Sequence, residues 1–186
     1  MKILVVPEDP TYDQYILKPI VEQLCSDIGV PARVDVLRDP HLRGVEQALD
    51  PATVAGIVLD NPMIDLFLLM IDRDGDRRGN EAKAQARATE HDILLVCLAI
   101  EEVEVWMLAL HRGELDEPWA AVRAEHDPKE RFADPLLRRL GWTGEVGRGR
   151  KRAMRELGKG WTGLLQVCPE LAEFRERVRA FCVARR

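Results

Sequence analysis

Residues 63–76 read MIDLFLLMIDRDGD, an apolar run that stops abruptly at acidic residues grouped around a glycine. A continuous apolar run bounded by a polar turn is typical of a strand buried on both faces of a parallel sheet. Residues 93–100, ILLVCLAI, form a second such run, and acidic residues follow it as well. The two runs therefore predict two central strands that each end in carboxylates.

Shorter patterns on either side of residue 63 predict the rest of the sheet and its helices. The other predicted strands are residues 2–6 and 33–37, and the predicted helices are residues 12–28, 42–60, 80–90 and about 101–110. Within residues 42–60, Pro51 fits the first position of a helix that Asp50 caps. The alternation of strands and helices predicts an α/β fold in which helices flank a mainly parallel central sheet.

Length and composition limit what the chain can be. It has 186 residues, 46% of them apolar, which suits one domain with a substantial core. We expect a single domain over residues 1–186, with a core of about 1–110 and a basic helical extension of about 111–186. No apolar run is long enough to span a bilayer, and the four cysteines form no CxxC pair. A soluble, cytoplasmic protein without membrane contact is expected.

Charge is distributed unevenly along the chain. The whole sequence carries a formal charge of −5, but residues 138–159 hold eight basic and two acidic side chains. The basic groups of this segment run from Arg138 to Lys159. Such a segment predicts contact with the backbone of a nucleic acid, and the alternative is a helix with a solvated basic face.

Acidic residues follow three of the predicted strands where each strand ends. They are Glu8 and Asp9, then Asp72, Asp74 and Asp76, then Glu101, Glu102 and Glu104. Because ligands of open parallel sheets bind at the carboxyl ends of the strands, neighbouring strands would bring these groups together. Converging carboxylates repel unless a cation neutralises them, and oxygen ligands alone suit Mg²⁺ or Mn²⁺. The alternative is that each acid caps a helix or stabilises a turn. A calcium loop is excluded, because its twelfth position would be Lys83.

Two of these motifs resemble a known family. Glu8 after the first strand and Asp72-Arg73-Asp74 after a later one resemble the Glu and DxD signatures of the Toprim fold. Residues 104–108, EVWML, are similar to the E-x-W-L-L segment of small bacterial Toprim-like proteins of the DUF4276 and RloB type, relatives of the OLD-family nucleases. The resemblance covers roughly residues 3–110. It implies a Toprim-like three-layer fold.

The resemblance also implies roles for particular residues. Asp72 and Asp74 would hold the metal, with Asp76 nearby or acting through water. Glu8 would be a ligand or the general base, and Glu104 would add a ligand or orient one. Lys159, between two glycines, is a candidate catalytic residue because some related nucleases use a late lysine. The alternative for Lys159 is a solvated surface side chain.

A metal-dependent nuclease, or a related phosphotransferase on nucleic acid, is the function that the resemblance implies, with a role in defence against mobile DNA. The alternative is a non-catalytic subunit that keeps the fold and binds nucleic acid or a partner. A separate ATPase is one such partner, since the chain has no GxxxxGK[ST] motif. A receiver-like or phosphatase domain fits poorly, because Pro7-Glu8 stands where that class needs an aspartate nucleophile.

Overall fold

A computed structural model describes residues 1–76 and 79–185 of the chain. Its centre is a four-stranded sheet in the order β2-β1-β3-β4, and every neighbouring pair of strands is parallel. The strands are β1 (Lys2–Pro7), β2 (Arg33–Val36), β3 (Leu66–Asp72) and β4 (Leu94–Ala99). This confirms the predicted α/β class. It also makes β1, β3 and β4, the three strands followed by acidic groups, direct neighbours.

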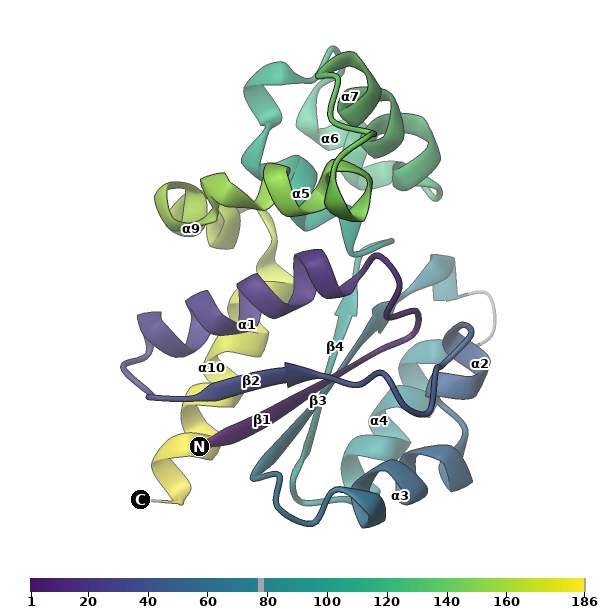
Figure 1. The fold of residues 1–186 in the computed structure, drawn as a ribbon, viewed down its shortest axis with the longest axis vertical. Helices are drawn as coiled ribbons and strands as arrows, with labels where there is room; N and C mark the ends of the chain where they lie inside the picture. Colours follow the sequence, from purple (N-terminus) through teal and green to yellow (C-terminus); the bar gives the residue numbers. More distant parts are fainter. Residues whose placement is uncertain (77–78, 186) are drawn as a thin grey trace.

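Helices cover both faces of the sheet and extend beyond its carboxyl end (Figure 1). They are α1 (Gln14–Asp27), α2 (Val45–Ala48), α3 (Pro51–Asp60), α4 (Asn80–Glu90), α5 (Glu104–Leu110), α6 (Trp119–Ala124), α7 (Asp134–Arg139), α8 (Arg150–Ala153), α9 (Leu157–Val167) and α10 (Pro169–Ala184). A π-helical turn, Lys129–Ala133, leads into α7. None of the described helices combines the length and the apolar character needed to cross a membrane.

The strands divide the core into two halves by their alternation. Ile3 and Val5 pack with α1 and α10 on one face, whereas Leu4 and Val6 pack with α3 and α4 on the other. Side chains of successive strand residues point to opposite faces, so a strand that is apolar throughout must be covered on both. β3 shows this best, because its residues from Leu66 to Ile71 are fully buried.

The predicted helical stretch 42–60 is two helices. Asp50 has extended backbone angles, and its carboxylate accepts a hydrogen bond of 2.8 Å from the Thr53 backbone N–H. Pro51 occupies the first helical position, as predicted, and disfavours helical geometry in the residue before it. The chain therefore breaks at Asp50, between α2 and α3.

The segment after residue 110 consists mainly of helices, and they pack on the rest of the chain. Leu136, Trp161 and Phe174 belong to the same buried cluster as Ile3 and Val5. Helices α5, α6, α7 and α9 lie beyond the carboxyl end of β4, and α10 returns along the sheet (Figure 1). The helical extension thus stands directly over the sheet edge where the acidic residues follow the strands.

Candidate functional site

Strand register sets the positions of the first two acidic groups. Pro7 pairs with Met70 across β1 and β3, and Asp72 pairs with Ala99 across β3 and β4. Glu8 and Asp72 therefore lie at the carboxyl ends of two neighbouring strands, at the same edge of the sheet. We call Glu8, Asp13, Asp72 and Glu104 the carboxylate cluster, because their charges act on one another.

Glu8 has one carboxylate oxygen held and one oxygen free. Its carboxylate accepts a hydrogen bond from the backbone N–H of Asp72. The other oxygen, Oε2, is buried and has no hydrogen-bond partner among the described residues. Burial raises the pKa of Glu8 to about 7, and the charges of Asp74 and Glu104 contribute in the same direction. A buried acceptor without a donor is costly, so this oxygen is suited to binding a proton or a cation.

Asp72 and Glu104 are oriented by groups from elsewhere in the chain. Oδ1 of Asp72 accepts a hydrogen bond of 2.8 Å from the Val103 backbone N–H. Burial raises the pKa of Asp72 well above its ordinary value, and Glu8 and Glu104 add to the effect. Oε1 of Glu104 accepts two hydrogen bonds from the guanidinium of Arg150, at 3.0 and 2.7 Å. Both carboxylates are therefore fixed in position before any ligand arrives.

Asp13 completes the cluster and was not predicted. The sequence places it inside a helix of residues 12–28, but α1 begins at Gln14, so Asp13 lies at the start of the helix. The pKa of Asp13 is raised to about 8. Burial is the largest cause, and the charges of Glu104 and Glu8 act in the same direction. Helical periodicity alone could not find it. The available signal was a carboxylate five residues after Glu8, in the loop that leaves β1.

Glu101 holds the loop that contains the remaining aspartates. Asp74, Gly75 and Asp76 all have positive φ angles, of 51°, 63° and 51°. Glycine and aspartate tolerate this left-handed conformation better than other residues do. The buried carboxylate of Glu101 accepts hydrogen bonds from the Arg73 guanidinium and from the Gly75 N–H. Burial raises the pKa of Glu101, but these bonds outweigh it and lower the pKa overall.

The two aspartates of this loop differ in what they contact. The charge of Asp74 raises the pKa of Glu8, so Asp74 acts on the carboxylate cluster. Asp76 accepts a hydrogen bond of 2.9 Å from the Glu81 backbone N–H and so caps the start of α4. The capping interpretation therefore applies to Asp76. The ligand roles of both residues stay predictions.

Lys159 does not join the cluster. Its side chain is 87% exposed, and its ammonium lies 3.9 Å from the carboxylate of Glu156. Lys129, in the π-helical turn, does lie close enough to the cluster for the charges to interact. Burial lowers the pKa of Lys129, but the charges of Glu104 and Glu102 outweigh this and raise it. The catalytic role predicted for Lys159 receives no support from these contacts.

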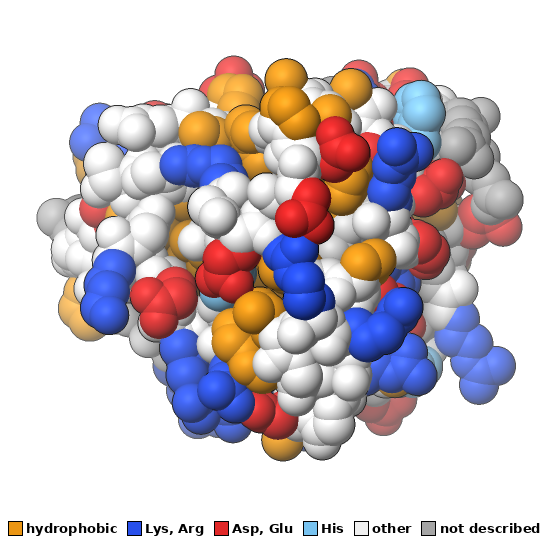
Figure 2. Space-filling model, turned by 90° about the horizontal axis from the view of Figure 1, so that it is seen from above, with side chains coloured by type: hydrophobic (Ala, Val, Ile, Leu, Met, Phe, Trp, Pro, Cys, Tyr) orange, Lys and Arg blue, Asp and Glu red, His pale blue; other side chains and the backbone are white. Residues whose placement is uncertain are grey.

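The basic segment contributes one buried cation. Arg150 is 1% exposed and lies between Glu104 and Asp134, so it is not part of a solvated basic face. Its guanidinium and that of Arg148 lie 5.3 and 5.4 Å from the ring centre of Tyr12. Figure 2 shows the face of the molecule that is seen from above, where Lys and Arg side chains are interspersed with acidic ones. The predicted basic segment is thus divided between a buried ion pair and scattered surface charges.

The cluster has the donor chemistry for Mg²⁺ or Mn²⁺ but not a finished coordination shell. Carboxylate oxygens are the ligands that these ions prefer. Across residues 1–76 and 79–185, however, no three acidic, histidine or cysteine side chains are already gathered as ligands of one ion. The buried, unpartnered oxygen of Glu8 fits a cation, and so do the raised pKa values around it.

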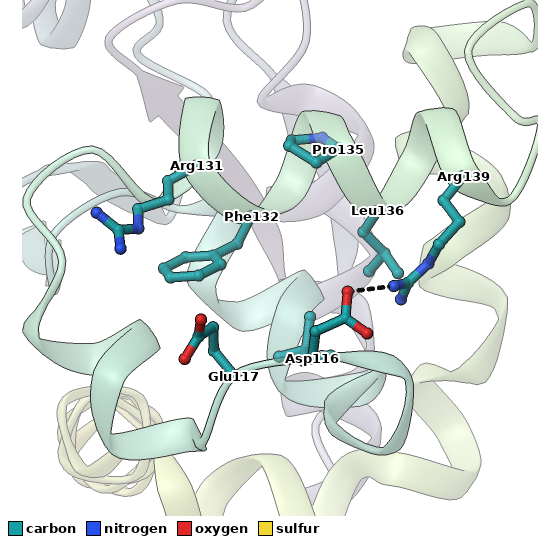
Figure 3. A pocket seen from close by; sticks show the side chains of 8 residues that line it. Asp116, Glu117, Arg131, Phe132, Pro135, Leu136 and Arg139 are labelled. Atoms are coloured by element: carbon teal, nitrogen blue, oxygen red, sulfur yellow. Dashed lines mark hydrogen bonds and ion pairs between the residues drawn. The ribbon is translucent and has the colours of Figure 1, made fainter.

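A separate hollow of about 320 Å³ lies between residues 115–117 and 131–139 (Figure 3). Asp116 and Arg139 form an ion pair of 2.5 Å there, and Glu117 and Arg131 line the same hollow. The charges of the two acidic and two basic side chains cancel. The hollow therefore favours neither anionic nor cationic ligands.

Comparison with known proteins adds no relative to this description. No protein-family model, curated protein or solved structure matches the chain.

Proposed function

We propose that the chain is a divalent-metal-dependent nuclease whose reaction takes place at the carboxylate cluster. The observation that carries this proposal is the Glu8 Oε2 atom, which is buried and unpartnered beside three other carboxylates. Three segments supply these acids, namely the β1–α1 loop, the end of β3 and the start of α5, at the edge of a parallel sheet where ligands bind. A purely structural role would give that oxygen a donor.

The raised pKa values support a cation in the cluster. Glu8 and Asp13, with pKa values of about 7 and 8, retain protons near neutral pH because burial and the repulsion of neighbouring carboxylates outweigh the hydrogen bonds and the Lys129 charge that act the other way. Mg²⁺ or Mn²⁺ would be held by Glu8 and Asp72, with Asp13, Asp74 or Glu104 near it, and would offset charge on phosphate oxygens. Where Asp72 binds the ion without Glu8, Glu8 would instead accept a proton from an attacking water.

Cations beside the cluster support a phosphate as the reacting group. Lys129 and Arg150 both lie close enough to Glu104 for its charge to raise their pKa values. One guanidinium nitrogen of Arg150, Nη1, is buried without a partner. Arg148, stacked on Tyr12, adds an exposed guanidinium at the same place. A phosphodiester would meet these cations on one side and the carboxylates on the other.

Thermal unfolding with and without metal tests the first step of this proposal. Mn²⁺ or Mg²⁺ should raise the melting temperature of the wild type, since a ligand that binds only the folded state stabilises it. Glu8→Gln and Asp72→Asn should each remove most of that shift. Asp60→Asn, an exposed residue on α3, is the matched control and should keep it. An equal shift in all four proteins would rule out the cluster as the metal site.

Cleavage assays test the second step. Labelled single-stranded DNA, duplex DNA and RNA are incubated with wild type and with Glu8→Gln, in Mn²⁺ and in EDTA. We expect cleavage only by the wild type and only with metal. Metal binding without cleavage of any substrate would favour the alternative, a non-catalytic nucleic-acid-binding subunit.

A further inference from the structure

A second cavity, of about 430 Å³, lies between α1 and the segment that begins at α8. We call it the Tyr15 pocket. Tyr15, Pro19 and Met154 give it an apolar wall, with the Tyr15 ring half-buried and Met154 almost fully buried. Cavities of a few hundred cubic ångströms with an apolar wall and a few polar groups are typical of small-ligand sites.

The rim of the Tyr15 pocket is strongly basic. Lys18, Arg38, Lys151 and Arg155 line it, against one acid, Glu22. That acid is paired with Lys18 at 3.7 Å. Lys151 and Arg155 are exposed and make no ion pair within the described chain. The pocket therefore combines an excess of positive charge at its rim with an apolar wall.

Residues of the pocket directly follow residues at the carboxylate cluster in two segments of the chain. Asp13 belongs to the cluster, and Gln14 and Tyr15 line the pocket. Arg150 holds Glu104 in the cluster, and Lys151 follows it on the rim of the pocket. Two segments of the chain thus run from the cluster to the pocket, so one bound strand could contact both sites.

We propose that the Tyr15 pocket binds one unpaired base of a single-stranded nucleic acid, with its rim cations on the adjacent phosphates. The flat ring of a base matches the Tyr15 and Pro19 wall, and stacking of bases on aromatic side chains tolerates any sequence. The phosphates of the strand would pair with the rim cations, since Lys151 and Arg155 form no ion pair with an acidic side chain of the described chain. A base paired in a duplex could not enter, so the inference assigns single strands as the substrate of the proposed nuclease, on which it rests.

Binding in EDTA tests this inference separately from catalysis. Fluorescence anisotropy is measured for a short labelled single-stranded oligodeoxynucleotide, for an abasic strand of equal length and for the corresponding duplex. The intact single strand should bind about fivefold or more tightly than the abasic strand, as expected for one stacked base. Equal affinity for the intact and abasic strands would overturn the pocket assignment.

Two variants locate the effect. Tyr15→Leu keeps an apolar side chain but removes the ring, so it should weaken binding of the intact strand about fivefold and leave the abasic strand unchanged. Lys151→Ala/Arg155→Ala should weaken binding of both strands. It should also reduce the slope of log affinity against log salt concentration by about 1.4, because each lost phosphate contact contributes about 0.7. Lys83→Ala/Arg179→Ala removes as many exposed charges from α4 and α10 and should change neither. Equal loss for both strands in Tyr15→Leu would contradict a base contact.

The outcomes separate this inference from the function on which it rests. A protein that cleaves nucleic acid with Mn²⁺ but binds intact and abasic strands equally would overturn only the base pocket. A protein that prefers the intact strand through Tyr15 but cleaves nothing would overturn only the nuclease.

Discussion

Arg150 Nη2 lies 2.7 Å from Glu104 Oε1, and both side chains are almost completely buried. The pair joins the start of α8 to the start of α5, across 46 residues of sequence. It fixes a carboxylate of the cluster and ties the helical extension to the sheet edge below it. Charges removed from water in this way are stable only while each has its partner.

Replacement of Arg150 should therefore destabilise the protein strongly. Arg150→Met leaves the buried Glu104 carboxylate without its guanidinium, and the expected loss is about 3–5 kcal/mol of unfolding free energy. Arg152→Ala, an exposed arginine two residues later, should cost less than about 1 kcal/mol. Urea denaturation of the two variants measures the difference.

A double variant shows whether the loss comes from the unpaired charge. Arg150→Met/Glu104→Leu removes both charges and should recover much of the stability lost in Arg150→Met. A double variant less stable than Arg150→Met would mean that the two residues stabilise the fold independently.

Stability without metal should fall as the pH rises from about 5 to 8. Glu8 and Asp13 have raised pKa values in the folded state, about 7 and 8, so the folded protein keeps protons that the unfolded chain releases. The contribution of these groups is complete below their ordinary values and is lost as the pH rises through the folded ones. Melting temperatures in EDTA at several pH values measure this.

Asp13→Asn identifies one source of the pH dependence. The amide cannot titrate, so the fall in melting temperature between pH 5 and 8 should be smaller than in the wild type. Asp60→Asn should keep the full slope. A wild-type melting temperature that rises over this range would contradict the buried, proton-retaining cluster.

The acidic loop gives a third prediction. Glu101→Ala removes the acceptor for the Arg73 guanidinium and for the Gly75 N–H, both of which are then left without it. The expected cost is about 1–3 kcal/mol, as for other bonds to a charged group. Glu173→Ala, on α10, is the control, and urea denaturation compares the two. If both lose the same small amount, Glu101 does not hold the loop.

The positions of the strands along the sequence could be predicted because their sequence pattern is local. The apolar runs at residues 63–71 and 93–100 can only be buried on both faces, and they became β3 and β4. The break at Asp50 and Pro51 also follows from local chemistry, since a proline N–H is absent and the preceding aspartate caps the helix. The placement of Glu8 and Asp72 at one edge followed from the parallel topology.

Asp13 and the cations beside the cluster depended on tertiary contacts that the sequence does not reveal. Arg150 stands in a run of basic residues, and only the packing of α8 against α5 buries it on Glu104. Asp13 has helical spacing like its neighbours, and only the late start of α1 directs it to the cluster. Lys129 lies in a polar stretch with no pattern at all. None of these three positions differs from a solvated residue in sequence alone.

The Tyr15 pocket depends on a glycine, and a matched pair of variants can test this. Gly147 has a φ angle of +65°, and a Cβ there would lie 2.4 Å from Tyr15 Cδ2. Gly141 has a φ of +70° but open space around it, so Gly141→Ala measures the backbone strain alone, about 1–2 kcal/mol. Gly147→Ala should cost about 1–3 kcal/mol more, because the ring must move, and should also weaken binding of the intact single strand. Equal losses of stability in the two variants would mean that Tyr15 is free to shift and that Gly147 does not set the wall of the pocket.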